Sequence, residues 1–162
     1  MKKIVFLLVC VAGALLSNAQ STTFILVRHA EKVEDGSKDP ALTKEGIQRS
    51  MKLKELLVSQ EINAVYSTPY ARTRATVAPT AKANELAVTE YKPMEKGFLK
   101  ETLDKHLGET ILIAGHSNTI PDLVNELIGD KKYSQLDEND YNYLFIVTVT
   151  EIGQGKEVVI SY

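Results

Sequence analysis

The sequence predicts an α/β domain, a three-layer αβα sandwich with a mostly parallel central sheet. Short unbroken apolar runs, such as those at 23–27 and 110–116, alternate along the chain with longer segments of helical apolar spacing. Strands that are apolar on both faces are typical of parallel sheets covered by helices on either side. No Gly-, Ser- or Pro-rich linker and no repeat interrupts the chain, which indicates a single domain.

The first half of the chain supplies two strands and two helices. A buried strand is expected at 23–27. After a polar loop, a helix is expected within 42–60, with Thr43 as its N-cap and with Ile47, Met51 and 53–57 on its apolar face. A second buried strand at 63–67 then leads into a helix from Tyr70, in which Pro79 should cause a kink or an early end.

The second half continues the alternation and ends in a strand pair. A weak strand at 87–91 precedes an amphipathic helix within 94–108, with Leu107 on its apolar side and Gly108 at its end. The clearest strand, 110–116, leads into a helix at 119–129. Two late strands, 143–152 and 156–162, are expected to form a hairpin that makes the sheet mixed.

Residues 1–19 have the three parts of a secretory signal peptide. Two lysines precede the apolar run 4–16, and Ser17 and Ala19 place small residues before an expected cleavage after Ala19. The apolar run is shorter than the roughly 20 residues of a membrane span, so no stable membrane insertion is expected after cleavage. The domain is therefore expected at 20–162, in a periplasmic or secreted protein.

Composition excludes several classes of site from residues 20–162. The only cysteine, Cys10, lies in the signal segment, and bulky Val9 before it disfavours a lipoprotein site. The remaining chain has no cysteine for a disulfide, a thiol nucleophile or a thiolate metal site. Loss of Lys2 and Lys3 from the 19 basic residues lowers the formal net charge from −2 to −4, which argues against nucleic acid as a partner.

Cationic and imidazole side chains follow three of the predicted strands. Arg28 and His29 end the first strand, Arg72 follows the second, and His116 ends the fourth. The carboxyl ends of parallel strands form the ligand-binding edge of such sheets. Arginine pairs bidentately with phosphate oxygens, and a neutral imidazole accepts a phosphoryl group through a ring nitrogen. These residues therefore suit phosphoryl chemistry.

Four motifs carry a resemblance to a known family. They are "LVRHAEK" (26–32), "LTKEG" (42–46), "STPYARTRAT" (67–76) and "LIAGHSNT" (112–119). In this order and spacing they resemble the signatures of the histidine phosphatase superfamily, which has the phosphoglycerate mutase-like fold. The match extends over essentially all of 20–162.

The resemblance implies a role for each matching residue. His29 is expected to be the nucleophile and to form a phosphohistidine, with Arg28, Arg72 and His116 in the phosphate pocket. Thr76 is expected in the supporting helix. Among further donors at the start of the following helix, Asn118 is a candidate substrate-binding residue, whereas Ser117 is expected to cap the helix. Neither a cofactor nor a metal is expected.

The proton donor of the family is not clearly present. His116 is followed by Ser117 where some members have aspartate, and the glutamate of other members has no clear counterpart. Glu31 and Glu95 are the candidates. A phosphoramidate leaving group needs an acid less, and only 43 residues separate Arg72 from His116, so the chain resembles the short SixA-like phosphohistidine phosphatases with an open pocket.

The sequence thus predicts a metal-independent phosphatase that hydrolyses a phosphomonoester or a phosphoramidate. The substrate is expected to be a phosphorylated small molecule or a phosphoprotein. Alternatives are a non-catalytic phosphate-binding module on the same fold and a phosphomutase. A serine hydrolase is disfavoured because Thr119, not glycine, lies two residues after Ser117. His106 is expected to be a solvated surface residue.

Overall fold

The computed structural model describes residues 20–93 and 95–162. The predicted signal peptide, including Cys10 and the expected cleavage after Ala19, lies outside the described residues. Within the part of the chain that is described, no helix is long and apolar enough to cross a membrane.

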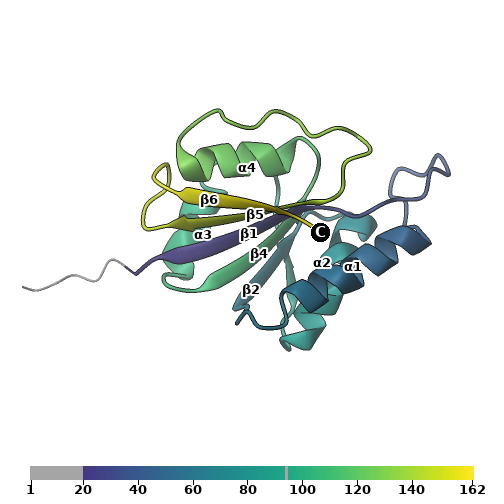
Figure 1. Cartoon of the computed structure of the whole chain (residues 1–162), viewed down its shortest axis with the longest axis horizontal. Helices are drawn as coiled ribbons and strands as arrows, with labels where there is room; N and C mark the ends of the chain where they lie inside the picture. Colours follow the sequence, from purple (N-terminus) through teal and green to yellow (C-terminus); the bar gives the residue numbers. More distant parts are fainter. Residues whose placement is uncertain (1–19, 94) are drawn as a thin grey trace, which may run out of the picture.

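A six-stranded mixed sheet forms the centre of the molecule (Figure 1). The strand order is β3-β2-β4-β1-β5-β6. The neighbours from β3 to β1 pair in parallel, whereas β5 is antiparallel to both β1 and β6. The predicted mostly parallel sheet with a late hairpin is therefore confirmed. The strands are β1 (Thr22–Arg28), β2 (Ala64–Ser67), β3 (Val88–Glu90), β4 (Thr110–Gly115), β5 (Tyr143–Val149) and β6 (Lys156–Ser161).

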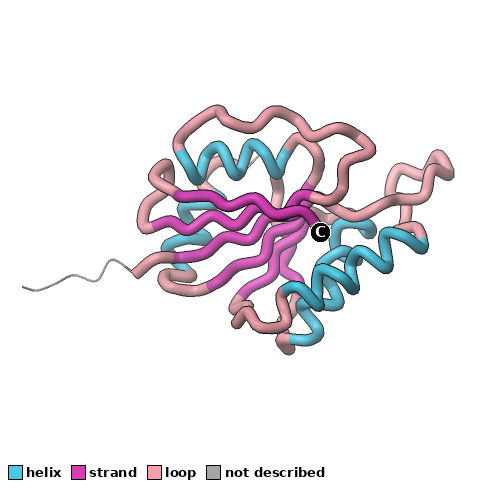
Figure 2. Tube along the Cα trace, viewed as in Figure 1, coloured by secondary structure: helices cyan, strands magenta, loops and turns pink. Residues whose placement is uncertain are grey.

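Helices cover both faces of the sheet, as Figure 2 shows. One face packs against α1 (Lys44–Leu56) and α2 (Ala71–Ala83), and the other against α3 (Phe98–Lys105) and α4 (Thr119–Ile128). Successive residues of β1 alternate between the two cores: Phe24 and Leu26 lie in one, Ile25 and Val27 in the other. Burial on both faces explains why the central strands read as unbroken apolar runs.

Two sequence signals at the helices have different outcomes. Thr43 is the N-cap of α1, as predicted, and its hydroxyl oxygen accepts a hydrogen bond of 3.1 Å from the amide of Gly46. Pro79 does not end α2, which continues to Ala83. The buried side chains of Val77 and Ala81 hold the turns around Pro79 against the sheet, and this packing outweighs the missing backbone hydrogen bond.

Three apolar residues that were expected on the buried faces of helices are exposed instead. Ile47 and Met51 on α1 are exposed, at 55% and 39%, because Gly46, Ser50 and Leu53 form the buried side of that helix. Helix α3 ends at Lys105, so Leu107 lies beyond it and is 52% exposed.

His106 is buried rather than solvated, which corrects the expectation for this residue. Its Nε2 lies 3.0 Å from the hydroxyl of Tyr66, and its Nδ1 lies 2.6 Å from a carboxylate oxygen of Glu109. Both ring nitrogens therefore have polar partners, which permits burial of the imidazole.

Replacement of Gly46 by alanine should destabilise the protein. Alanine normally stabilises a helix interior by about 1 kcal/mol relative to glycine. Here the new Cβ would lie 2.3 Å from the carbonyl oxygen of Glu31, so the segment after His29 must shift. Denaturant unfolding should show a loss of about 1–3 kcal/mol for Gly46→Ala, against a change within about 0.5 kcal/mol for exposed Gln48→Ala. Equal or higher stability of Gly46→Ala would contradict this packing.

Candidate active site

The carboxyl ends of β1, β2 and β4 bring the predicted residues together. Arg28 is the last residue of β1 and pairs with Gly115 at the end of β4. The amide of His29 donates to the carbonyl of Gly115 over 2.9 Å, so the chain after β1 stays beside the chain after β4. The rings of His29 and His116 meet edge to face with centroids 5.4 Å apart. Parallel pairing therefore places both imidazoles in one site.

The ring of His29 is held in a defined orientation. Its Nδ1 lies 2.8 Å from the carbonyl oxygen of Ala30. A carbonyl only accepts, so Nδ1 carries the hydrogen and Nε2 keeps its lone pair. Burial, together with the charges of Arg72 and Arg28, lowers the pKa of His29 to about 3, although the bond to Ala30 opposes this shift. The imidazole is thus neutral and nucleophilic at neutral pH.

His116 is also neutral and lies in a polar setting. Its Nε2 is 2.9 Å from the hydroxyl of Thr68, and the ring of Tyr70 packs edge to face against it at 5.1 Å. Burial lowers the pKa of His116 to about 4, followed by the charges of Arg72 and Arg28. A negatively charged ligand in the site would counter these effects and favour the imidazolium, which donates hydrogen bonds from both nitrogens.

Arg72 presents unused donors to the site. Its Nε and Nη1 are buried and have no hydrogen-bond partner among the described residues. The nearest carboxylate, on Asp39, is 3.8 Å from Nη1, beyond hydrogen-bond distance. The guanidinium carbon lies 4.6 Å from the centroid of the Tyr70 ring, which fixes the plane of the fork. Buried guanidinium donors without partners are costly, and an oxyanion would satisfy them.

Arg28 is already engaged by a loop. The residue is only 2% exposed, and its Nη1 donates to the carbonyl oxygens of Asp137 and Asp140 over 2.7 and 3.0 Å. Its Nη2 donates to Glu138 over 3.2 Å, and the ring of Tyr141 lies 4.2 Å from the guanidinium carbon. Sequence reasoning missed this loop, since its polar residues carry no periodic signal.

Thr76 connects the segments that carry His29 and Arg72. Its hydroxyl accepts a hydrogen bond of 2.9 Å from the amide of Ala30 and donates one of 2.8 Å to the carbonyl of Arg72. The side chain is fully buried in α2. One threonine therefore sets the position of the nucleophile segment relative to the start of α2.

His29, Arg72 and His116 border a hollow of about 390 Å³, whereas Arg28 and Thr76 are not among its lining residues. Asn118 contributes to its wall and is the N-cap residue of α4, but its side chain makes no capping bond. Ser117 does not cap the helix as expected, because its hydroxyl instead donates to Glu138 over 3.2 Å. The hollow is lined by His29, Lys32, Tyr70, Arg72, Pro93, His116, Ser117, Asn118, Thr119 and Glu138.

Neither Glu31 nor Glu95, the two predicted proton donors, is among the residues that line this hollow. The carboxylate of Glu31 turns onto Arg49 of α1, with bonds of 2.7–3.0 Å. Burial alone would raise the pKa of Glu31, but the hydrogen bonds and charge of Arg49 outweigh it and leave that pKa below its usual value. Glu31 therefore stays ionised. Glu95 borders a different hollow, beside Tyr91 and Phe98.

No group of three or more His, Cys, Asp or Glu side chains that could hold a metal ion occurs in the described stretches 20–93 and 95–162. Cationic side chains do line the hollow, namely the guanidinium of Arg72 and the ammonium of Lys32, and the buried guanidinium of Arg28 lies behind Glu138.

The two histidines should make stability depend on pH. Their pKa values are about 3 and about 4 in the folded protein, against 6.5 for an ordinary histidine. Between about pH 6.5 and 4 the unfolded chain binds more protons, so the free energy of unfolding should fall as the pH is lowered through this window. In phosphate-free buffer, His116→Asn should show a shallower decline than the wild type by denaturant unfolding. Parallel curves would contradict a buried neutral His116.

Comparisons with known proteins agree with this geometry. Residues 24–95 match the family model of the histidine phosphatase superfamily, branch 1. A search of curated proteins by sequence gave no match.

Solved structures share the fold over most of the chain. The protein histidine phosphatase SixA complexed with tungstate is 20% identical, with a TM-score of 0.71 over 86% of this chain and 96% of that one. A mycobacterial glucosyl-3-phosphoglycerate phosphatase is 10% identical, with a TM-score of 0.71 over 88% of this chain and 98% of that one. A phosphoserine phosphatase variant from Entamoeba histolytica in complex with phosphoserine is 17% identical, with a TM-score of 0.64 over 86% of this chain and 95% of that one.

The family match covers the segment that contains His29 and Arg72, and the structural likeness extends through the segment that contains His116. Residues 24–95 thus resemble the histidine phosphatase superfamily, and the chain has a SixA-like fold.

Proposed function

We propose that this protein is a metal-independent phosphatase that acts through a phosphohistidine on His29. The observation that carries the proposal is that a neutral, oriented imidazole and the Arg72 guanidinium, two of whose buried donors lack protein partners, line the same hollow. A phosphoryl group bound in that hollow would lie beside both His29 and Arg72. The match of residues 24–95 to the histidine phosphatase superfamily supports the same mechanism.

The proposed reaction has two displacements at phosphorus. Nε2 of His29 attacks, the bond to the leaving group breaks, and a phosphohistidine forms while the Nδ1–H bond to Ala30 stabilises the imidazole. Arg28, Arg72 and His116 would neutralise the charge on the three equatorial oxygens, which is the main requirement of phosphoryl transfer. Water then attacks the phosphohistidine and releases phosphate.

The substrate proposed is a phosphomonoester or a phosphoramidate, on a small molecule or on a phosphoprotein. Tyr70 at the rim is 38% exposed, and Asn118 beside it is exposed, so a large leaving group would not be enclosed. The similar structures are named for different phosphorylated substrates, and this supports the class of reaction rather than one compound. A mutase is disfavoured because it must shield its intermediate from water.

A purely phosphate-binding module is disfavoured by the state of His29. Binding alone does not need an imidazole whose Nδ1 is tied to a backbone carbonyl and whose Nε2 is left with a free lone pair. Arg72 and His116 would hold the bound phosphate in a phosphatase and in a binding module alike. The two functions therefore differ in whether the substrate is hydrolysed.

Trapping of the intermediate tests the function. A ³²P-labelled phosphomonoester, mixed rapidly with the protein and quenched in alkaline denaturant, should leave an acid-labile label on the wild type. His29→Ala should carry none, because it lacks the accepting nitrogen, while His106→Gln should label normally because His106 lies outside the hollow. EDTA should not reduce the labelling. Equal labelling of the wild type and His29→Ala would reject the mechanism.

We also propose that residues 1–19 direct secretion and that 20–162 form the exported domain. The basis is the order of two lysines, an apolar run and small residues at the N-terminus. In fractionated Gram-negative cells the protein should appear outside the cytoplasm, with Gln20 at its N-terminus by mass spectrometry. Recovery of the uncleaved chain in the cytoplasm would contradict this location.

A further inference from the structure

We propose that Glu138 is the acid–base residue of the reaction, an assignment that rests on the phosphatase function proposed above. Glu138 is the one carboxylate among the described residues that line the hollow containing His29, Arg72 and His116. It comes from the loop between α4 and β5, a part of the chain that none of the four sequence motifs includes.

The carboxylate is held on two sides within the site. Oε2 accepts from Arg28 over 3.2 Å, and Oε1 accepts from the Ser117 hydroxyl over 3.2 Å and from Gln135 over 3.4 Å. Arg28 also clamps the flanking loop through the carbonyls of Asp137 and Asp140. The carboxylate is thus placed between the last residue of β1 and the residue that follows His116.

Exposure places Glu138 on the side where a leaving group would emerge. Its side chain is 68% exposed, whereas that of Arg28 is 1% exposed and that of Arg72 is 13% exposed. A phosphoryl group held by the buried guanidiniums has its ester oxygen directed toward the open side, where Glu138 can reach it.

The other acidic groups near the site are committed elsewhere. Glu31 is bound to Arg49, and Glu95 borders another hollow. Asp39 accepts a hydrogen bond from the amide of Ala71 over 2.8 Å, which fixes its carboxylate at the start of α2. Glu138 is therefore the group available for proton transfer.

Glu138 gives up a proton in the first step of the reaction and takes one back in the second. When His29 Nε2 bonds to phosphorus, the electron pair of the broken P–O bond goes to the leaving oxygen, which takes the proton of the Glu138 carboxyl. The resulting carboxylate then takes a proton from the attacking water, and the P–N electron pair returns to Nε2. The products are an alcohol and phosphate, and Glu138 regains its proton.

An acid in this position extends the substrate class to phosphomonoesters of ordinary alcohols, whose leaving oxygen requires a proton.

The test is the rate of phosphohistidine formation in single turnovers with two leaving groups. Glu138→Gln keeps the size and shape of the side chain and one accepting oxygen but removes the acid. Label transfer from glycerol 2-phosphate should slow by about 10²–10⁴-fold, whereas transfer from p-nitrophenyl phosphate, whose leaving group needs no proton, should slow less than about 10-fold. Glu138→Asp should recover part of the glycerol 2-phosphate rate.

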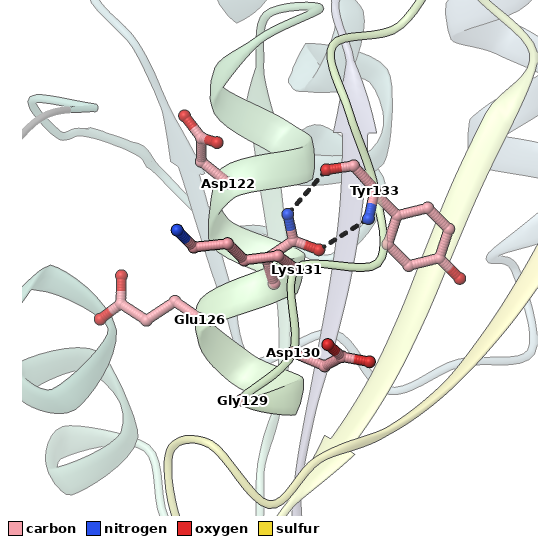
Figure 3. Close-up of a pocket in the computed structure, with 7 residues that line it drawn as sticks. Asp122, Glu126, Gly129, Asp130, Lys131 and Tyr133 are labelled. Carbon is pink, nitrogen blue, oxygen red and sulfur yellow. Dashed lines mark hydrogen bonds between the residues drawn. The ribbon is translucent and has the colours of Figure 1, made fainter.

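Glu126→Gln is the matched control. Glu126 lies on α4 in a separate hollow, with Asp122, Lys131 and Tyr133 around it (Figure 3). This hollow shares no lining residue with the catalytic one, so both rates should equal those of the wild type.

Three results would overturn the assignment. Equal slowing with both substrates would mean that Glu138 only positions Arg28. A lower KM with unchanged or higher kcat would mean that the carboxylate merely competes with phosphate for Arg28. Wild-type rates with both substrates would mean that it has no part in the reaction. In each case the wild type still forms the His29 adduct, so the proposed function stands; absence of that adduct in the wild type would defeat the function itself.

Discussion

Burial of two guanidinium groups beside two imidazoles is the constraint on which the rest of the site depends. Arg28 and Arg72 bring positive charge to a desolvated edge of the sheet, and together with burial they keep His29 and His116 neutral. The same burial leaves donors of Arg72 without partners. The site therefore favours entry of an oxyanion, and it holds a nucleophilic nitrogen for that anion.

The fold fixes this arrangement by pairing elements that are distant in sequence. The parallel order β2-β4-β1 places Thr68, His116 and His29 at adjacent strand ends. Thr76 then ties the segment after β1 to α2, and Gly46 lets α1 approach the backbone of Glu31 closely. Rigid strands and short hydrogen bonds thus hold the site in place, while the loop at 134–142 closes one side of it. Glu138, the proposed acid–base residue, belongs to that less regular part.

Residues that enter the site because they lie at strand ends could be predicted from the sequence. Residues whose role depends on the direction in which the side chain points could not. Arg28, His29, Arg72 and His116 follow apolar runs, and sheet topology alone brings such positions together. Glu31 is close to His29 in the chain, but Arg49 on a separate helix turns its carboxylate away. Glu138 follows no periodic segment, and its place depends on long-range bonds such as that between Leu136 and Ser117. Ile47 fits the helical period of α1, yet the tight approach at Gly46 rotates it toward solvent.

A crystal structure of the mature protein with tungstate, a phosphate-like oxyanion, tests the central claim most directly. The account predicts the tungsten atom beside Nε2 of His29, with Nε and Nη1 of Arg72 donating to its oxygens and His116 in contact. The Nδ1 bond of His29 to Ala30 should persist. An oxyanion bound away from His29, or a His29 ring turned so that Nε2 no longer faces the hollow, would contradict the account.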